Sequence, residues 1–140
     1  MILCEDETYK EAAEFYASKL GIPEDTIIAI NLYEDTQSIA GYCEYHEEDV
    51  IPYFLVGIDE TDYDGQEDDP ISVLAHEMVH VKQYVKGELV DHGRYCSWHG
   101  KKYTAEAEIN SEEYFFSPWE VEAYGMQVGL YRMYLESIPE

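Results

Sequence analysis

Positive charge is scarce in this sequence. Only 8 of the 140 residues are Lys or Arg, against 31 Asp and Glu, which gives a formal net charge of −23. No Lys or Arg occurs between Lys19 and Lys82. A surface of this sign repels phosphate, so we exclude direct nucleic-acid binding. Two interpretations of the acidity stay open: a well-solvated surface, or a surface that binds a basic partner, as a DNA mimic would.

Cysteines and long apolar runs are also few. Cys4, Cys43 and Cys96 form an odd number without tight spacing, which argues against a disulfide framework and for a reducing compartment. The first residues hold no basic segment followed by an apolar run, so no secretion signal is predicted. The longest apolar stretch, residues 50–58, is too short to span a bilayer. With no repeat and no Gly/Ser linker, we expect one soluble, cytoplasmic domain over residues 1–140, without a membrane partner.

The hydrophobic pattern predicts an α+β fold. Helices are predicted over residues 6–20 and 70–86, and a third helix is predicted from Ser117 towards Leu135. Segments rich in Ile, Val and Tyr predict strands, which cover residues 26–33, 38–46 and 50–58. Pro52 would weaken a central strand, so we expect the third strand at an edge of the sheet.

The acidic segment 60–69 resembles the first half of a calcium-binding loop. Acidic residues alternate there and are followed by Gly65, but Ile71 stands where the last glutamate of such a loop is required. A solvated acidic loop is the simpler interpretation, and a calcium ion is the alternative.

The helix predicted over residues 70–86 carries the pattern His76-Glu77-x-x-His80. The i, i+4 spacing stacks two imidazoles so that both can reach one zinc ion. Glu77 is offset from the pair, and it can reach a water bound to that ion and act as a general base. On a helical wheel both sides of this helix look covered, which fits a helix that runs under a cleft. Ordinary helix histidines beside a solvated glutamate are the alternative.

A catalytic zinc site needs a third protein ligand and an open position. Ser117 and Glu120 have the spacing of a capping box, which gives Glu120 a structural role. Glu122 lies about 160° round the helix from Glu120, and a half-buried carboxylate there would need a partner. We predict Glu122 as the third ligand, with His99 as the main alternative. Further candidates after His80 are Glu88, Asp91, His92 and Cys96.

The segment HEMVH, followed by a later helix with WEVEAYG, resembles the zincin metallopeptidases, in particular the gluzincins. Their third ligand is a glutamate on a later helix, commonly followed by a small residue and an aromatic, with a tryptophan three positions before it. Trp119, Glu122, Ala123 and Tyr124 match this pattern. The resemblance covers roughly residues 68–135. The chain is also similar in size to minimal single-domain members, including proteins of phages and archaeal viruses, whose compartment is the host cytoplasm.

The resemblance implies a small twisted sheet packed on the active-site helix, with the later helix carrying the third ligand. It also implies hydrolysis of peptide or protein substrates by a zinc-activated water, with Glu77 as general base. The strand over residues 50–58 would then border the cleft and bind extended peptide by strand addition. Tyr84, Tyr103 and Tyr131 are candidates for stabilising the oxyanion.

The sequence departs from the family pattern in its spacing. Glu122 follows His80 after 41 residues, a longer gap than in many relatives, whereas His99 follows after 18. The segment WHGKKY also resembles the His-Gly segment of SprT-like proteases. Two other functions stay open: a zincin scaffold that binds zinc without catalysis, and an acidic decoy that binds a basic partner. The sequence identifies neither the substrate nor the oligomeric state.

Overall fold

A computed structural model describes residues 1–34, 40–61, 69–103 and 112–139 of the chain. The fold is α+β, as predicted, with a small mixed sheet, a three-stranded sheet and four helices in the described ranges. In chain order the elements are β1 (Ile2–Leu3), α1 (Glu7–Leu20), β2 (Ile28–Tyr33), β3 (Gly41–His46), β4 (Tyr53–Asp59), α2 (Pro70–Val85), β5 (Leu89–Asp91), β6 (Cys96–Trp98), β7 (Lys101–Tyr103), α3 (Glu112–Phe116) and α4 (Pro118–Ser137).

The larger sheet has the strand order β1-β2-β4-β3. Strands β1, β2 and β4 run parallel, and β3 pairs with β4 antiparallel. The prediction of an edge position for the strand in residues 50–58 is therefore wrong, because β4 lies between β2 and β3. Pro52 precedes the first residue of β4 and removes no hydrogen bond from the ladder. Strand β3 is the edge strand beside β4.

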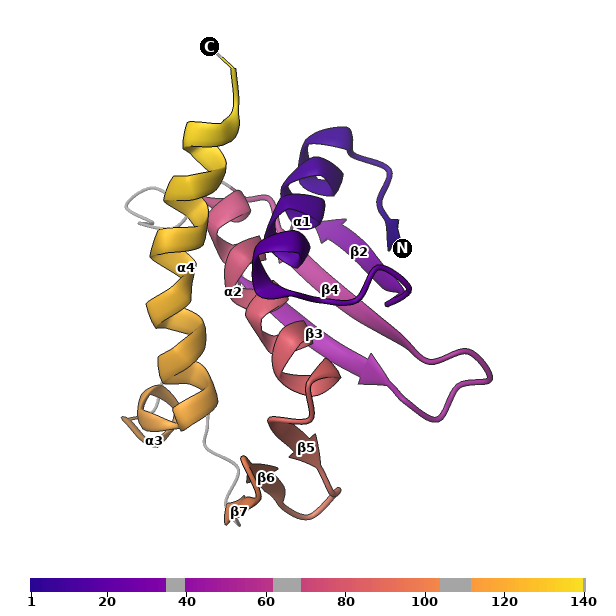
Figure 1. The fold of residues 1–140 in the computed structure, drawn as a ribbon, viewed down its shortest axis with the longest axis vertical. Coiled ribbons are helices and arrows are strands. Elements are labelled where there is room, and N and C mark those ends of the chain that lie inside the picture. The colour runs from indigo at the N-terminus through magenta and orange to yellow at the C-terminus, as the bar shows by residue number, and fades with distance from the viewer. Residues whose placement is uncertain (35–39, 62–68, 104–111, 140) are drawn as a thin grey trace.

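Helices α1 and α2 cover one face of the larger sheet, and α4 packs along α2 (Figure 1). Asp6 caps α1 by accepting hydrogen bonds from two backbone N–H groups, and Gly21 ends the helix with φ 69°. Tyr16 of α1 is fully buried, and its hydroxyl donates to the carbonyl of Ile71 at 3.1 Å. This contact ties α1 to the first turn of α2.

The smaller antiparallel sheet, with strand order β5-β6-β7, follows the C-terminal end of α2 (Figure 1). The calcium interpretation of residues 60–69 falls mostly outside the described residues, because the description omits 62–68. Within the described ranges, no helix has both the length and the apolar character that crossing a membrane requires.

Candidate metal centre

Helix α2 presents the His76-Glu77-x-x-His80 pattern from the middle of the protein. Its start is fixed by Asp69, whose carboxylate accepts from the Ile71 N–H at 2.8 Å, and by Pro70 in the first turn. The helix is buried on nearly all sides, as the two-sided wheel predicts. Both histidines and Glu77 are among its buried residues, with 5–8 % of their surface exposed.

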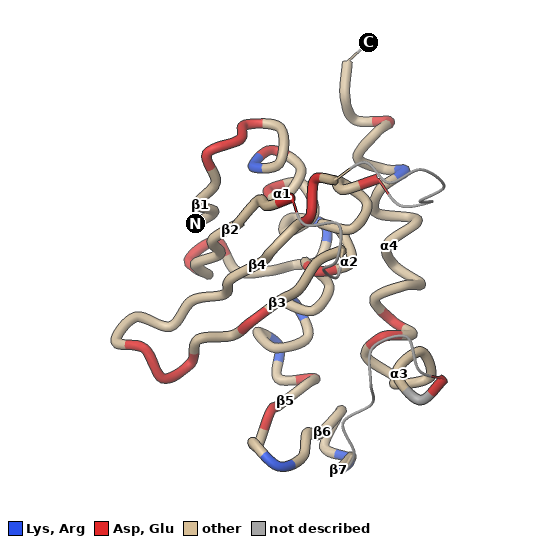
Figure 2. The backbone as a smooth tube through the Cα atoms, turned by 180° about the vertical axis from the view of Figure 1, so that it is seen from behind, with Lys and Arg blue, Asp and Glu red and all other residues tan. Residues whose placement is uncertain are grey.

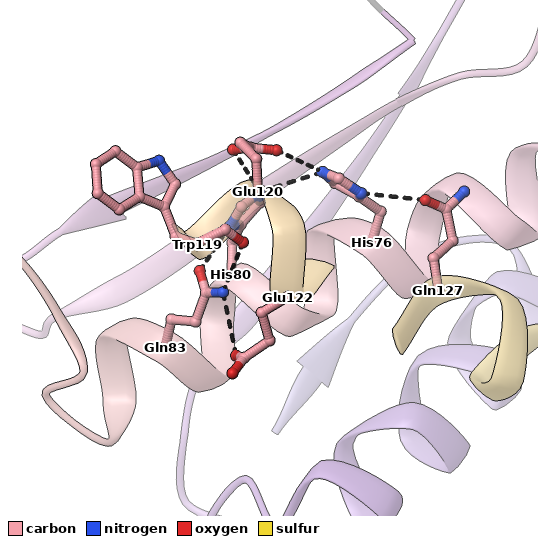
Figure 3. Close-up of polar contacts among 7 residues, drawn as sticks. All are labelled: His76, His80, Gln83, Trp119, Glu120, Glu122 and Gln127. Atoms are coloured by element: carbon pink, nitrogen blue, oxygen red, sulfur yellow. Dashed lines mark hydrogen bonds and ion pairs between the residues drawn. The ribbon is translucent and has the colours of Figure 1, made fainter. Parts of the chain in front are cut away.

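His76, His80 and Glu120 bring three metal-ligand atoms together (Figure 3). Nε2 of His76 lies 3.1 Å from Oε1 of Glu120, and Nε2 of His80 lies 3.2 Å from Oε2. The two Nε2 atoms are 3.2 Å apart. The three side chains are therefore close enough to hold one metal ion. Within the described residues no second group of three His, Cys, Asp or Glu side chains has this property.

The spacing and chemistry of the three donors suit zinc. Two ligand atoms about 2.0–2.1 Å from a tetrahedral ion lie about 3.3 Å from each other. The observed separations of 3.1–3.2 Å are close to that value. Two imidazoles and one carboxylate are also the donor set of many catalytic zinc sites, which keep a fourth position open. The residues present therefore fit a zinc ion.

Two buried glutamines orient the histidines. Nδ1 of His76 donates to Oε1 of Gln127 at 3.1 Å, and Nδ1 of His80 donates to Oε1 of Gln83 at 2.8 Å. The amide orientation of Gln83 is fixed, because its Nε2 donates to the carbonyl of Trp119 at 2.9 Å. With both Nδ1 atoms bonded to these amide oxygens, the Nε2 atoms of both histidines face Glu120 and are the atoms left for a metal ion. Such outer partners hold a ligating histidine in the correct tautomer.

Replacing Gln127 by alanine is expected to weaken zinc binding about 10- to 100-fold, because His76 loses the acceptor that fixes its tautomer. Ser72→Ala is the matched control, since the Ser72 hydroxyl accepts from the amide nitrogen of Gln127 at 3.1 Å and not from His76. Zinc titration against a competing chelator measures both affinities. Equal affinities in the two variants would refute an orienting role for Gln127.

Glu122, predicted as the third ligand, lies elsewhere. Its Oε1 accepts from Lys82 Nζ at 2.8 Å and from Gln83 Nε2 at 3.2 Å. Glu120 therefore replaces Glu122 as the candidate ligand, and Glu122 supports His80 only through Gln83. The capping role expected for Glu120 is also not formed, because the side chain of Ser117 makes no capping hydrogen bond. The carboxylate of Glu120 turns towards the histidines instead.

The side of α4 that is buried explains why Glu120, and not Glu122, lies beside the histidines. The side of α4 that faces the protein is formed at i, i+3, i+7, i+10 and i+14 by the buried residues Glu120, Ala123, Gln127, Leu130 and Tyr134. Met126 and Met133, on the side of Glu122, are 37 % and 42 % exposed. The sequence contains a signal for Glu120 as a ligand, because Glu120 and Gln127 are the polar positions on an otherwise apolar stripe of this helix.

The other predicted residues lie outside the group of three. His99 occupies the turn between β6 and β7 with φ 48°, and its ring contacts Trp98. Among the predicted tyrosines, Tyr131 hydrogen-bonds to Asp69, and the ring of Tyr103 contacts Trp119. No sequence pattern indicates Tyr114, whose hydroxyl hydrogen-bonds to Glu120 and Tyr124.

The burial of opposite charges shifts the pKa values of the group. Burial alone would lower the pKa of His80, but its hydrogen bond to Glu120 and the nearby carboxylate charges outweigh this and raise the pKa to about 9. Burial would raise the pKa of Glu120, but hydrogen bonds to His76 and His80 lower it to about 2. Burial raises the pKa of Glu77, against the opposing effect of both histidines. The metal-free centre therefore holds a proton on His80 at neutral pH.

A zinc ion bound at both Nε2 atoms would have to displace that proton, so we expect the zinc affinity to depend on pH. We expect the apparent affinity to rise about tenfold per pH unit between roughly pH 7 and 9 and then to level off. Chelator competition, corrected for titration of the chelator, measures this slope. A flat affinity between pH 7 and 8 would show that His80 is already neutral there.

The same pKa shifts affect the stability of the metal-free protein. The raised pKa of His80 stabilises the fold fully below about pH 6.5, and this contribution is lost as the pH rises through about 9. The lowered pKa of Glu120 contributes above about pH 4.5, and this contribution is lost as the pH falls through about 2. From these two groups, stability of the metal-free form is greatest between about pH 4.5 and 6.5.

Comparison of the sequence with models of protein families, with curated proteins and with solved structures gives no match.

Proposed function

We propose that this protein is a zinc-dependent peptidase of the zincin type. The observation that carries the proposal is the convergence of Nε2 of His76, Nε2 of His80 and the Glu120 carboxylate beside a buried Glu77. Zinc bound there lowers the pKa of water towards neutrality and polarises a carbonyl. The sequence motif and the α+β fold support the same class, with Glu120 in the place first given to Glu122.

Glu77 lies between the metal ligands and the edge strand. A Cβ atom on Gly41 of β3 would lie 3.1 Å from Oε2 of Glu77 and 2.9 Å from Val73 Cγ1, so glycine lets the strand approach this carboxylate. A substrate held along β3 would present its peptide carbonyl near Glu77. In this function Glu77 removes a proton from the attacking water and delivers it to the leaving amine.

Tyr114 is the candidate for stabilising the oxyanion. Its hydroxyl hydrogen-bonds to Glu120, and burial raises its pKa, so it stays protonated at neutral pH. It takes this role in place of Tyr84, Tyr103 and Tyr131, which the sequence suggested.

The test of the proposed function is hydrolysis of a diverse peptide library by protein loaded with one equivalent of zinc, read by mass spectrometry. We expect new peptide termini that disappear on chelation and return when zinc is added. Stoichiometric zinc without any cleavage would instead identify a zinc-binding scaffold without catalysis. Absence of zinc binding, together with salt-sensitive binding of basic proteins, would identify an acidic decoy.

A further inference from the structure

Strand β3 has one edge without a partner strand in the part of the chain that the structure describes. The Asp59 N–H donates to the Ala40 carbonyl at 2.9 Å, and Gly41 pairs with Ile58 in the antiparallel register. Hydrogen-bonded pairs alternate in such a ladder, so the backbone groups of Gly41, Cys43 and Tyr45 point away from β4. They can pair with an extended peptide.

A groove of about 930 Å³ runs along this open edge. Residues 43–49 form one wall, and Tyr84 with residues 89–93 forms the other. The edge begins at Gly41, next to the Glu77 carboxylate, and the groove continues from Cys43 towards the β3–β4 turn. The six residues of β3 span roughly 17 Å, which is room for a segment of about five or six residues. The groove therefore begins two residues along β3 from the contact with Glu77 and extends away from the proposed catalytic centre.

In the part of the chain that the structure describes, the walls of the groove carry fixed charge of one sign. Figure 2 shows Asp and Glu along β3, its turn and β5. None of the described residues that line the groove is Lys or Arg, and Arg94 borders a neighbouring pocket instead. Five carboxylates line it: Glu44, Glu47, Glu48, Asp49 and Asp91. A peptide with negative charge would be repelled here, whereas Lys or Arg side chains would be attracted.

We infer that this groove selects extended peptide segments that carry Lys or Arg several residues to one side of the cleaved bond. The inference rests on the proposed peptidase function for its biological meaning. Backbone pairing with β3 supplies sequence-independent binding, and the groove carboxylates supply the preference for positive charge. The carboxylates act locally, so the preference is distinct from the general attraction of a protein with net charge −23 for cations.

The test compares three fluorescent peptides of equal length, with alternate residues Lys, Gln or Glu, bound to full-length zinc-loaded Glu77→Gln protein. We expect the Lys peptide to bind about 3- to 10-fold tighter than the Gln peptide, and the Glu peptide to bind weakest. The double variant Glu47→Gln/Glu48→Gln, added in the same background, should lose most of this difference. The control Glu11→Gln/Glu14→Gln removes the same charge from exposed positions on α1. This control should keep the preference for the Lys peptide.

Equal binding of the three peptides would overturn the inference. An equal loss of preference in the groove and control variants would also overturn it, because the effect would then be general electrostatics. Hydrolysis by the wild-type protein is scored separately. Charge-selective binding without hydrolysis would contradict only the peptidase function, and hydrolysis without charge preference would contradict only the groove.

Discussion

Replacing Glu77 by glutamine is expected to lower peptide hydrolysis about 10²- to 10⁴-fold while one zinc ion stays bound. Glutamine has nearly the shape of glutamate but cannot accept the proton of the attacking water. Glu77 is buried beside His76, His80 and Glu120 but does not belong to the group of three ligands. The loss should therefore fall on kcat, with little change in zinc affinity.

Steady-state kinetics together with elemental analysis of the same sample measures both effects. Wild-type turnover in the zinc-loaded variant would rule out Glu77 as the general base. Loss of zinc in parallel with turnover would mean that Glu77 acts in metal binding. Thermal unfolding of both proteins with zinc bound shows whether the variant is folded.

Replacing Glu120 by glutamine is expected to weaken zinc binding about 10²- to 10³-fold. Structural zinc sites gain about 10–16 kcal/mol from four ligands, or roughly 2.5–4 kcal/mol for each one. The amide of glutamine cannot supply the charge that the carboxylate brings to the two imidazoles. The loss should be larger at pH 8 than at pH 6, because at pH 6 the wild-type affinity is itself reduced by the proton that Glu120 helps to hold on His80, and the variant lacks this carboxylate.

Glu122→Gln is the matched control for Glu120→Gln. It makes the same chemical change two residues away on the same helix. Because Glu122 contacts only Lys82 and the amide of Gln83 among the polar groups near the centre, we expect a loss below about tenfold. Chelator competition ranks the two variants. A larger loss in Glu122→Gln would restore the sequence-based assignment of the third ligand.

The histidine pair and its helix are predictable from the sequence because the information is local. Asp69, Pro70 and the helical spacing of His76 and His80 all lie within one segment, and helix α2 begins at Pro70 as predicted. The α+β class is also confirmed, since the strand segments and helices depend mainly on short-range hydrophobic patterns.

The third ligand depends on which side of α4 faces α2, and that is a long-range property. Val121, Val128 and Leu135 form a second apolar stripe on α4, with 48–63 % of their surface exposed. Because α4 has apolar residues on more than one side, the hydrophobic pattern does not identify which side is buried. The polar residues Glu120 and Gln127 are on the buried side because the histidines of α2 provide their partners.

The position of β4 in the sheet was predicted wrongly for a similar reason. Strand order depends on contacts between distant segments, such as the parallel pairing of β2 with β4. Pro52 is informative only if it belongs to the strand, and the strand begins one residue later. An error of a few residues at the strand boundary thus led us to predict an edge position for a strand that is central in the sheet.

Anomalous diffraction at the zinc absorption edge, from crystals of the zinc-loaded protein, is the most direct test of the metal centre. We predict one strong peak about 2.0–2.2 Å from Nε2 of His76, Nε2 of His80 and a carboxylate oxygen of Glu120. A zinc ion held by Glu122 or His99, or crystals with no peak between the two histidines, would contradict this centre.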